Sequence, residues 1–334
     1  MRQFWYIAAE ANELGNRPLA RQVLGEPLVL FRDEQGAAIA LFDRCPHRNA
    51  PLSDGRINGG RLMCPYHGWE FDGSGRCTFI PSLREGEAIP AAAQCGRFPV
   101  VEQDGYVWVW MGEGEPGASR PFKLPHRGEP GWADARLSCV IRNQVDNVIE
   151  NFIDCPHTGY VHGGLFRQPA SHLARTVVRQ VEDGVVIDIE EEQQTSSVLG
   201  RLLVGKHRVT HQDRFILPAT VQVAYGFGPE REITGFQICT PESEFVTRVY
   251  VYVTWKMGWL TPLIRPFVPF VGRVVLNQDL GVLERQGELI QRHGARFTST
   301  PADTANLWIQ ACRKRAAEGQ PPLSGREKQV EFRL

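Results

Sequence analysis

Several features that would assign this chain to a particular class are missing from its sequence. It has no C-x-x-C pair, the commonest element of a zinc knuckle, and its eight cysteines are too irregularly spaced for a disulfide scaffold. The formal net charge of −1 gives no electrostatic reason to expect binding to nucleic acid or to an anionic membrane. The N-terminus has no charged segment followed by an apolar one, so we expect no signal peptide and a cytoplasmic protein.

A long uninterrupted apolar run is also absent. The nearest approach is the segment 257–275, which contains Arg265, Arg273 and three prolines and is therefore too interrupted to predict a membrane span. Its role is left open between two interpretations. It is either a buried loop or broken helix, or an apolar lid at the entrance of a substrate pocket.

Two short motifs near the N-terminus each combine a cysteine with a histidine. They are Cys45-Pro46-His47 and, after sixteen intervening residues, Cys64-Pro65-Tyr66-His67. Two thiolates on one iron and two imidazoles on the other are the ligands of a Rieske [2Fe–2S] cluster, a one-electron carrier. The alternative is a zinc site with two cysteines and two histidines, which more often draws a C-x-x-C pair from one knuckle. The pattern therefore predicts the iron–sulfur cluster.

Periodicity predicts an α+β chain with two domains. Residues 1–112 read as short strands between turns, a small antiparallel β domain, and the glycine- and proline-rich stretch 113–131 reads as a linker. We place the domain boundaries at 1–115 and 116–334. The second domain is expected to be an antiparallel sheet with helices packed on it, similar to a helix-grip fold. Its predicted strands are Val185–Ile189, Thr220–Tyr225, Thr234–Cys239 and Val246–Trp255, and its predicted helices are Asn143–His162, Gln278–His293 and one that begins at Thr300-Pro301.

The helix after the linker carries a second candidate metal site, Asp154-x-x-His157-x-x-x-x-His162. Two histidines and a carboxylate form the facial triad of mononuclear non-haem Fe(II). Positions i and i+5 lie about 140° apart on a regular helix, so both imidazoles can reach one ion only if the helix is distorted. Pro156 and Gly159 make such a distortion plausible. Spacing alone does not identify the carboxylate ligand.

With these motifs in place, the chain resembles the catalytic α subunits of Rieske non-haem iron oxygenases. The similarity is closest to the branch of vanillate- and dicamba-type O-demethylases and of saxitoxin-pathway hydroxylases. The motifs that carry it are Trp5-Tyr6-x-Ala8, Cys-Pro-His-Arg at 45–48, Cys-Pro-Tyr-His-Gly at 64–68, Asn147-x-x-Glu150-Asn151-x-x-Asp154-x-x-His157-x-x-x-x-His162, and Gln278-Asp279 followed by Glu284 and Gln286.

The resemblance implies several roles that spacing could not supply. It makes Asp279 the third ligand of the mononuclear iron, although family members often have Glu where this chain has Gln278. It makes Asp154 an electron-transfer bridge between His157 and His67 of a neighbouring subunit, in a homotrimer. It also implies that NAD(P)H electrons arrive indirectly, through a separate reductase or ferredoxin.

The expected activity is that of a monooxygenase or demethylase that uses O₂ on an apolar, aromatic or fused-ring molecule. The alternatives are a cis-dihydroxylating dioxygenase subunit, a non-catalytic Rieske electron-transfer protein, and a membrane-associated oxygenase. Aromatic side chains in the second domain are candidates for the substrate pocket, and each could equally be core packing. These candidates are Phe152, Phe166, Tyr225, Phe227 and Phe236.

Overall fold

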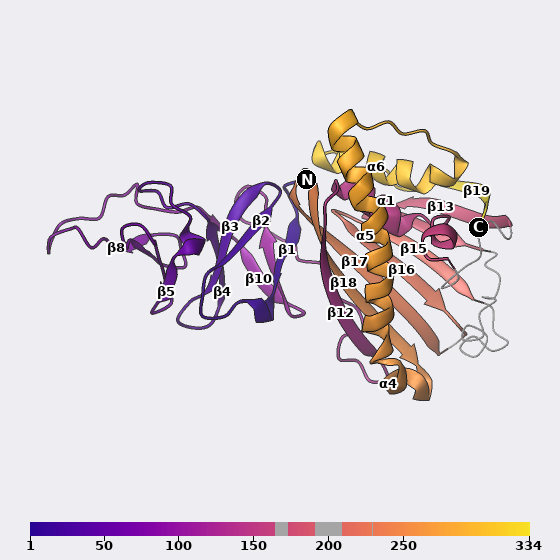
Figure 1. Ribbon diagram of the computed structural model, residues 1–334, viewed down its shortest axis with the longest axis horizontal. Helices are drawn as coiled ribbons and strands as arrows, with labels where there is room; N and C mark the ends of the chain where they lie inside the picture. The colour runs from indigo at the N-terminus through magenta and orange to yellow at the C-terminus, as the bar shows by residue number, and fades with distance from the viewer. Residues whose placement is uncertain (164–172, 191–208, 229) are drawn as a thin grey trace. The chain divides into compact units, whose positions relative to one another are not determined.

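The computed structural model describes residues 1–163, 173–190, 209–228 and 230–334 (Figure 1). The chain divides into two compact units, Arg2–Lys123 and Leu124–Leu334, the second of which also includes Met1. The division falls inside the glycine- and proline-rich stretch 113–131. We describe each unit by itself.

The first unit consists of three small antiparallel sheets and two short 3₁₀ turns, η1 (Ala11–Glu13) and η2 (Leu52–Asp54). The first sheet has the order β1 (Trp5–Glu10), β11 (Tyr106–Trp110), β10 (Val100–Gln103). The second has the order β2 (Leu19–Val23), β3 (Glu26–Arg32), β4 (Ala38–Phe42), β9 (Arg97–Phe98). The third has the order β5 (Arg56–Asn58), β6 (Arg61–Met63), β7 (Glu70–Phe71), β8 (Cys77–Phe79).

Strand β3 separates two hydrophobic cores in this unit. Successive side chains of a strand point to opposite faces, so Leu28 and Leu30 pack in one core while Val29 and Phe31 pack in the other. The core around Val29 and Phe31 also holds Cys45 and Cys64. The two cysteine motifs are therefore supported by an apolar interior that excludes water from the sulfur atoms.

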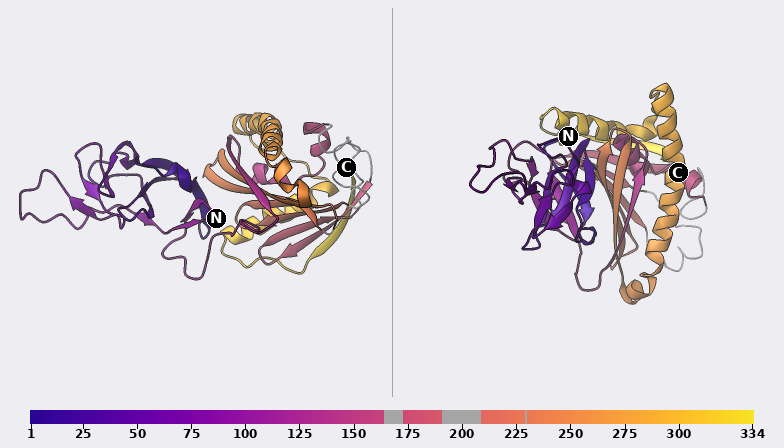
Figure 2. Two further views of the ribbon diagram at one scale, coloured as in Figure 1. Left: turned by 90° about the horizontal axis from the view of Figure 1, so that it is seen from below. Right: turned by 60° about the vertical axis from the view of Figure 1, so that its left-hand side comes forward.

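The second unit is one eight-stranded antiparallel sheet with helices. Figure 2 shows this sheet and its helices from two further sides. Its order is β12 (Ala133–Ile141), β18 (Val246–Met257), β17 (Arg231–Ser243), β16 (Thr220–Gly226), β15 (Thr210–Ile216), β14 (Gly184–Ile189), β13 (Leu173–Val181), β19 (Glu327–Arg333). The helical segments are α1 (Val145–Ile153), α2 (Thr158–Val161), η3 (Gly258–Leu260), α4 (Thr261–Ile264), α5 (Phe267–His293), η4 (Pro301–Asp303) and α6 (Thr304–Ala317).

The core of the second unit lies between one face of this sheet and helices α1, α5 and α6. Val148 and Ile149 of α1, Leu283 of α5 and Ile309 of α6 all belong to one buried cluster with strand residues such as Phe215. The α+β class and the antiparallel sheet predicted from the sequence are confirmed. The predicted helix 143–162 is instead two helices, α1 and α2, with a break between them.

The apolar segment 257–275 forms η3, α4 and the first turns of α5. The backbone is therefore the broken helix of the first interpretation, but the burial that went with that interpretation is absent, because Trp259, Phe267 and Phe270 are exposed. No single described helix is long and apolar enough to cross a membrane. The bent pair Gly258–Ile264 and Phe267–His293, whose axes differ by 65°, reaches that length and composition together.

Two glycines of α5 give a matched test of how tightly this helix packs. A Cβ atom on Gly287 would lie 2.3 Å from the backbone oxygen of Arg142, whereas a Cβ atom on Gly281 would meet nothing within 4 Å. We expect Gly287→Ala to lower the thermal midpoint of unfolding, because backbone atoms cannot move aside. Gly281→Ala should instead stabilise the helix by about 0.5–1 kcal/mol. Thermal denaturation followed by circular dichroism measures both, and equal effects would contradict this packing.

Candidate functional site

The two cysteine motifs of the first unit have the same backbone geometry. Each cysteine carbonyl accepts a hydrogen bond from the fourth residue after it: Asn49 N–H donates to Cys45 at 2.9 Å, and Gly68 N–H donates to Cys64 at 3.1 Å. Both donors have positive φ, 62° for Asn49 and 70° for Gly68, which asparagine and glycine adopt most readily. Each motif is therefore a tight loop folded around its cysteine. Both cysteines are buried.

The two histidines of these loops lie next to each other, with ring centroids 4.6 Å apart. The His47 ring also stacks on Trp69 at 4.6 Å, and its buried Nδ1 atom has no hydrogen-bond partner. A buried polar atom without a partner is costly unless something unseen binds it, and a metal ion would do so. Burial raises the pKa of the Cys45 thiol to about 11, so a metal must displace that proton. These residues fit the iron–sulfur cluster.

In the second unit, a sharp corner between α1 and α2 carries both histidines of the second motif. Helix α1 ends at Ile153, and Asp154 follows in extended conformation with φ −80° and ψ 101°. Pro156 lacks an N–H donor and disfavours helical backbone at the residue before it, so the helix cannot continue through this point. Helix α2 (Thr158–Val161) then begins, with His157 as its N-cap and His162 as its C-cap. The predicted helix distortion is confirmed.

This corner brings three metal-binding atoms together. The Nε2 atoms of His157 and His162 are 3.3 Å apart, and the Oδ1 atom of Asp279 lies 3.6 Å from the first and 3.2 Å from the second. With metal–ligand bonds of about 2.1 Å, such separations correspond to angles of about 100–120° at a single ion. Helix α5 supplies Asp279, which is buried, as is His162. The donor set and its spacing fit a mononuclear metal ion.

The other nitrogen of each ring is held by an oxygen acceptor. His162 Nδ1 donates to Oε1 of Gln278 at 2.9 Å, and His157 Nδ1 donates to the carbonyl of Asp154. Because Nδ1 carries the proton in both neutral rings, the lone pair of each Nε2 faces Asp279. The Nδ2 group of Asn151 donates to Oδ1 of Asp279 at 3.4 Å. Gln278 and Asn151 are supporting residues whose roles spacing did not reveal.

The carboxylate of Asp154 lies on the opposite side of His157 from this group. It accepts the backbone N–H of His157 at 3.1 Å, and one of its oxygens is 3.5 Å from His157 Nδ1. It is partly exposed, with a side-chain exposure of 33%. Asp154 therefore contacts the outer edge of a candidate ligand without joining the three converging atoms.

The aromatic candidates for the substrate pocket do not form one group. Tyr225 stacks on His211 at 4.1 Å and on Phe227 at 6.4 Å. Phe236 lies on the other face of the sheet, since it is paired with Gln222 and Tyr252 and packs on the Tyr252 ring at 6.2 Å.

The remaining two candidates differ in what can be said of them. Phe152 packs at the edge of the main core between the helices and the sheet. Phe166 lies outside the described residues. Tyr225 and Phe227 are therefore the only two candidates that the described part of the chain brings into contact with each other.

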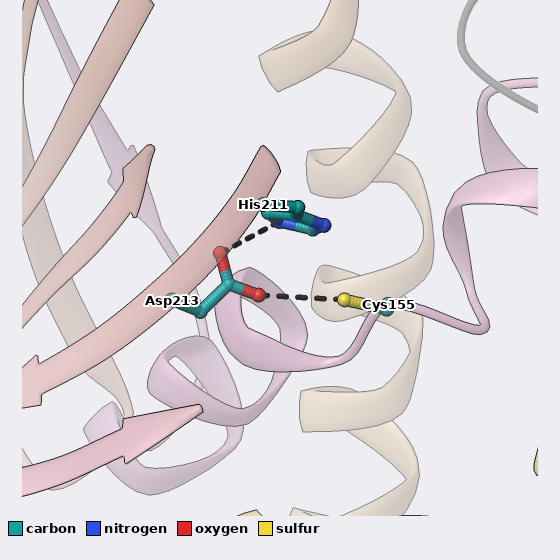
Figure 3. A group of neighbouring side chains, drawn as sticks. All are labelled: Cys155, His211 and Asp213. Carbon is teal, nitrogen blue, oxygen red and sulfur yellow. Dashed lines mark hydrogen bonds and ion pairs between the residues drawn. The ribbon is translucent and has the colours of Figure 1, made fainter. Parts of the chain in front are cut away.

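A buried polar cluster behind the corner was not predicted from the sequence (Figure 3). Asp213 on β15 accepts a hydrogen bond from Cys155 Sγ at 3.3 Å on one oxygen and lies 2.9 Å from His211 Nε2 through the other. All three side chains are buried. The cluster ties strand β15 to the residue two positions before His157, so it fixes the corner to the sheet. The polar residues His211 and Asp213 at alternate positions of β15 are the sequence signal.

Charge at the three-atom site predicts a pH dependence. Burial lowers the pKa of His157, but hydrogen bonds to Asp154 and Asp279 outweigh this and raise it from 6.5 to about 9, while the pKa of Asp279 is lowered. A proton on His157 therefore stabilises the metal-free fold fully below pH 6.5, and this stabilisation is lost as the pH rises through about 9.

We expect the thermal midpoint of chelator-treated protein to fall across this pH window. Asp279→Asn removes the charge that retains the proton, so its profile should be flatter. Because metal and proton compete for His157, anaerobic Fe(II) binding should tighten as the pH rises from 6.5. An Fe(II) affinity independent of pH would contradict the assignment of His157 as a metal-binding residue.

Comparison with known proteins agrees with this division of the chain. Residues 4–98 match the model of the Rieske [2Fe-2S] domain, and residues 141–319 match that of the vanillate O-demethylase oxygenase C-terminal domain. The oxygenase component of dicamba O-demethylase from Stenotrophomonas maltophilia is 40% identical over 190 residues, which cover 56% of this chain and 54% of that protein. The chloroplastic chlorophyllide a oxygenase of Chlamydomonas reinhardtii is 38% identical over 349 residues, or 96% of this chain and 50% of that protein.

The chain spans about half the length of these curated relatives. Among solved structures, dicamba monooxygenase bound to dicamba superposes with a TM-score of 0.82 at 28% identity, covering 95% of this chain and 97% of that one. The second family model alone covers more than half of the chain. The chain therefore belongs to the Rieske non-haem iron oxygenases, in the branch that has the vanillate O-demethylase type of catalytic domain.

Proposed function

We propose that this protein is the oxygenase component of a Rieske monooxygenase or demethylase that acts on an aromatic or fused-ring small molecule. The observation that carries the proposal is the convergence of His157, His162 and Asp279, with donor atoms 3.2–3.6 Å apart in the catalytic domain. A pure electron carrier of the Rieske type would need only Cys45, His47, Cys64 and His67. A second site with two imidazoles and one carboxylate is suited to oxygen chemistry, since it leaves positions free on one side of the ion.

In this proposal, His157, His162 and Asp279 would hold Fe(II), and the two cysteine–histidine loops would hold the [2Fe–2S] cluster. When bound, the cluster supplies single electrons and the mononuclear iron supplies a place for O₂ next to the substrate. The protein's own task is to hold the two imidazoles in one tautomer and to keep bulk water out. The acceptors at Nδ1, Gln278 and the Asp154 carbonyl, perform the first part of this task.

The family resemblance implies glutamate in many members at the position where this chain has Gln278. A neutral amide accepts the hydrogen bond from His162 without adding a second negative charge beside Asp279. The three donor side chains, two neutral imidazoles and one carboxylate, therefore carry a total charge of −1. A glutamate in place of Gln278 would add a second negative charge next to them. We infer that this chain favours a slightly less electron-rich iron site than relatives with glutamate do.

Electrons would come from NAD(P)H through a separate reductase or ferredoxin. Tyr66 is 65% exposed and its ring lies against that of His67, with centroids 3.9 Å apart and planes tilted by 34°, so an exposed aromatic ring contacts a proposed cluster ligand directly. Such a ring is suited to a brief contact with an electron donor. We also propose a homotrimer in which Asp154 of one subunit faces the cluster of the next.

The substrate class rests on the aromatic contacts of the sheet and on the names of the relatives. Tyr225 and Phe227 form a stack that presents flat apolar surface to a planar molecule. The matched proteins include dicamba and vanillate O-demethylases and toluene-4-sulfonate monooxygenase subunits. These names support an aromatic substrate and leave the choice between hydroxylation, demethylation and dihydroxylation to product analysis.

Two carboxylates on α5 provide the test of this function. Asp279→Ala should lose the mononuclear iron, keep the visible spectrum of the cluster, and abolish O₂-dependent product formation. Glu284→Ala is the matched control, five residues along the same helix, and should retain all three properties. Turnover is measured with NADH and a broad-specificity reductase as the electron source. The substrates tested are aromatic acids, aryl methyl ethers and fused-ring compounds. Oxygen uptake and mass spectrometry of the products report the reaction. If Glu284→Ala empties the iron site and Asp279→Ala does not, the assignment is wrong.

A second prediction concerns Asp154 as an electron-transfer bridge. Asp154→Asn keeps the size of the side chain but removes the charge that favours a strongly donating His157 imidazole. Both iron sites should still fill, because Asp154 ligates neither, while turnover falls steeply.

Mixed oligomers test whether the electron crosses between subunits. Subunits without a working cluster (Cys45→Ser) are co-assembled with subunits without mononuclear iron (His162→Ala). Regained activity that neither parent has is the expected result. Inactive mixtures of subunits that still fold and associate would place the transfer within one chain.

A further inference from the structure

Exposed apolar side chains gather on one short segment of the second unit. Five of the thirteen large apolar side chains that are exposed in the described part of the chain lie between residues 259 and 271. They are Trp259 (74% exposed), Phe270 (69%), Phe267 (65%), Leu263 (56%) and Val271 (38%). The other eight are spread over both units. Scattered apolar residues need no explanation on a protein surface, but a concentration of this kind marks a site of contact.

These five residues are spaced so that they share the exposed side of η3, α4 and the first turns of α5. Trp259 and Leu263 are four residues apart across η3 and α4, and Phe267, Phe270 and Val271 follow at i, i+3 and i+4 on α5. We call these five residues the 259–271 surface, and their side chains make the outward side of the segment apolar.

This segment is anchored to the sheet. Thr261 is buried, its backbone oxygen accepts a hydrogen bond from Trp255 Nε1 at 3.1 Å, and its hydroxyl accepts one from the backbone N–H of Met257 at 2.8 Å. The last residues of strand β18 therefore fix the position of η3 and α4. The exposed side chains therefore belong to a segment whose backbone is hydrogen-bonded to the sheet.

Within residues 245–278 of the chain, every charged side chain is basic. The sequence has no aspartate or glutamate between Glu244 and Asp279, and Asp279 is buried in the iron site. Arg265 and Arg273, which flank the apolar residues, are both exposed. Lys256 is not included among the basic residues of this surface, because it lies opposite Glu232 in the sheet.

We propose that the 259–271 surface docks on the surface of an anionic lipid bilayer. The aromatic and aliphatic side chains would enter the boundary between headgroups and acyl chains, and Arg265 and Arg273 would contact headgroup phosphates. This proposal concerns binding alone and does not depend on the proposed function.

Two observations favour docking over the other ways of covering this surface. A membrane span is disfavoured because α5 continues into the protein core, where Asp279 and Leu283 are buried. A contact of the surface with its own copy would set Arg265 and Arg273 against like charges. An anionic bilayer offers both an apolar layer and the opposite charge.

Flotation of the full holoprotein with vesicles tests the proposal. We expect binding to vesicles of phosphatidylcholine mixed with phosphatidylglycerol, and much weaker binding to phosphatidylcholine alone. Phe267→Ser with Phe270→Ser should weaken binding about tenfold or more, because two phenylalanines leave the apolar layer. Arg265→Gln with Arg273→Gln should weaken only the preference for the anionic vesicles, by about fivefold or more. Phe297→Ser is the matched control, since Phe297 is 60% exposed beyond the other end of α5, and it should bind like the unaltered protein.

Three results would overturn the proposal. The first is no flotation of the unaltered protein with either vesicle. The second is flotation that the phenylalanine variant does not weaken, which would place the lipid contact elsewhere. The third is a change of oligomeric state in the phenylalanine variant without lipid, measured by light scattering, which would show that the surface is a contact between subunits. Cluster absorbance and iron content should stay unchanged in every variant, which keeps this test separate from that of the oxygenase function.

Discussion

The catalytic unit is organised around a local excess of electron-pair donors. Two imidazole Nε2 atoms and a carboxylate oxygen face one another at 3.2–3.6 Å in a site where His162 and Asp279 are buried. Such a group is unstable without a cation or a proton among its members, because burial strengthens the repulsion between lone pairs and removes the water that would screen it. The raised pKa of His157 and the lowered pKa of Asp279 express this need for positive charge.

The rest of the unit serves to hold those three atoms in place. Pro156 ends α1, so His157 and His162 can face one ion from the two ends of a single helical turn. The buried cluster of Cys155, His211 and Asp213 then fixes the corner to the sheet. Helix α5, which packs closely enough that Gly287 admits no side chain, brings Asp279 from a position more than a hundred residues later in the chain.

The sequence was most informative where chemistry requires fixed residue types in a short stretch. The cysteine–histidine loops, the distortion of the helix that carries His157 and His162 and the two-domain α+β organisation could all be predicted from local pattern. Asp279 could not be chosen over Glu284 from spacing, because both lie on the same helix. The choice came from the family resemblance.

Features that depend on partners distant in the chain were not predictable. The hydrogen bond from His162 to Gln278 joins two helices, and the face on which Phe236 lies depends on a strand register that only the assembled sheet defines. The role of the apolar segment 257–275 stayed open between burial and a lid, because composition does not show which side of a helix meets the core. The structure shows several of its apolar side chains exposed, while Thr261 is buried and hydrogen-bonded to the end of β18.

The most direct test of this account is the iron content of the unaltered protein together with its Mössbauer spectrum. We predict three irons per chain in two kinds of site: an antiferromagnetically coupled pair with unequal ligands, and one high-spin Fe(II) with nitrogen and oxygen ligands. The single Fe(II) should disappear in His162→Ala while the pair remains. Two irons per chain in fully loaded protein, or a change in the pair when His162 is replaced, would contradict it.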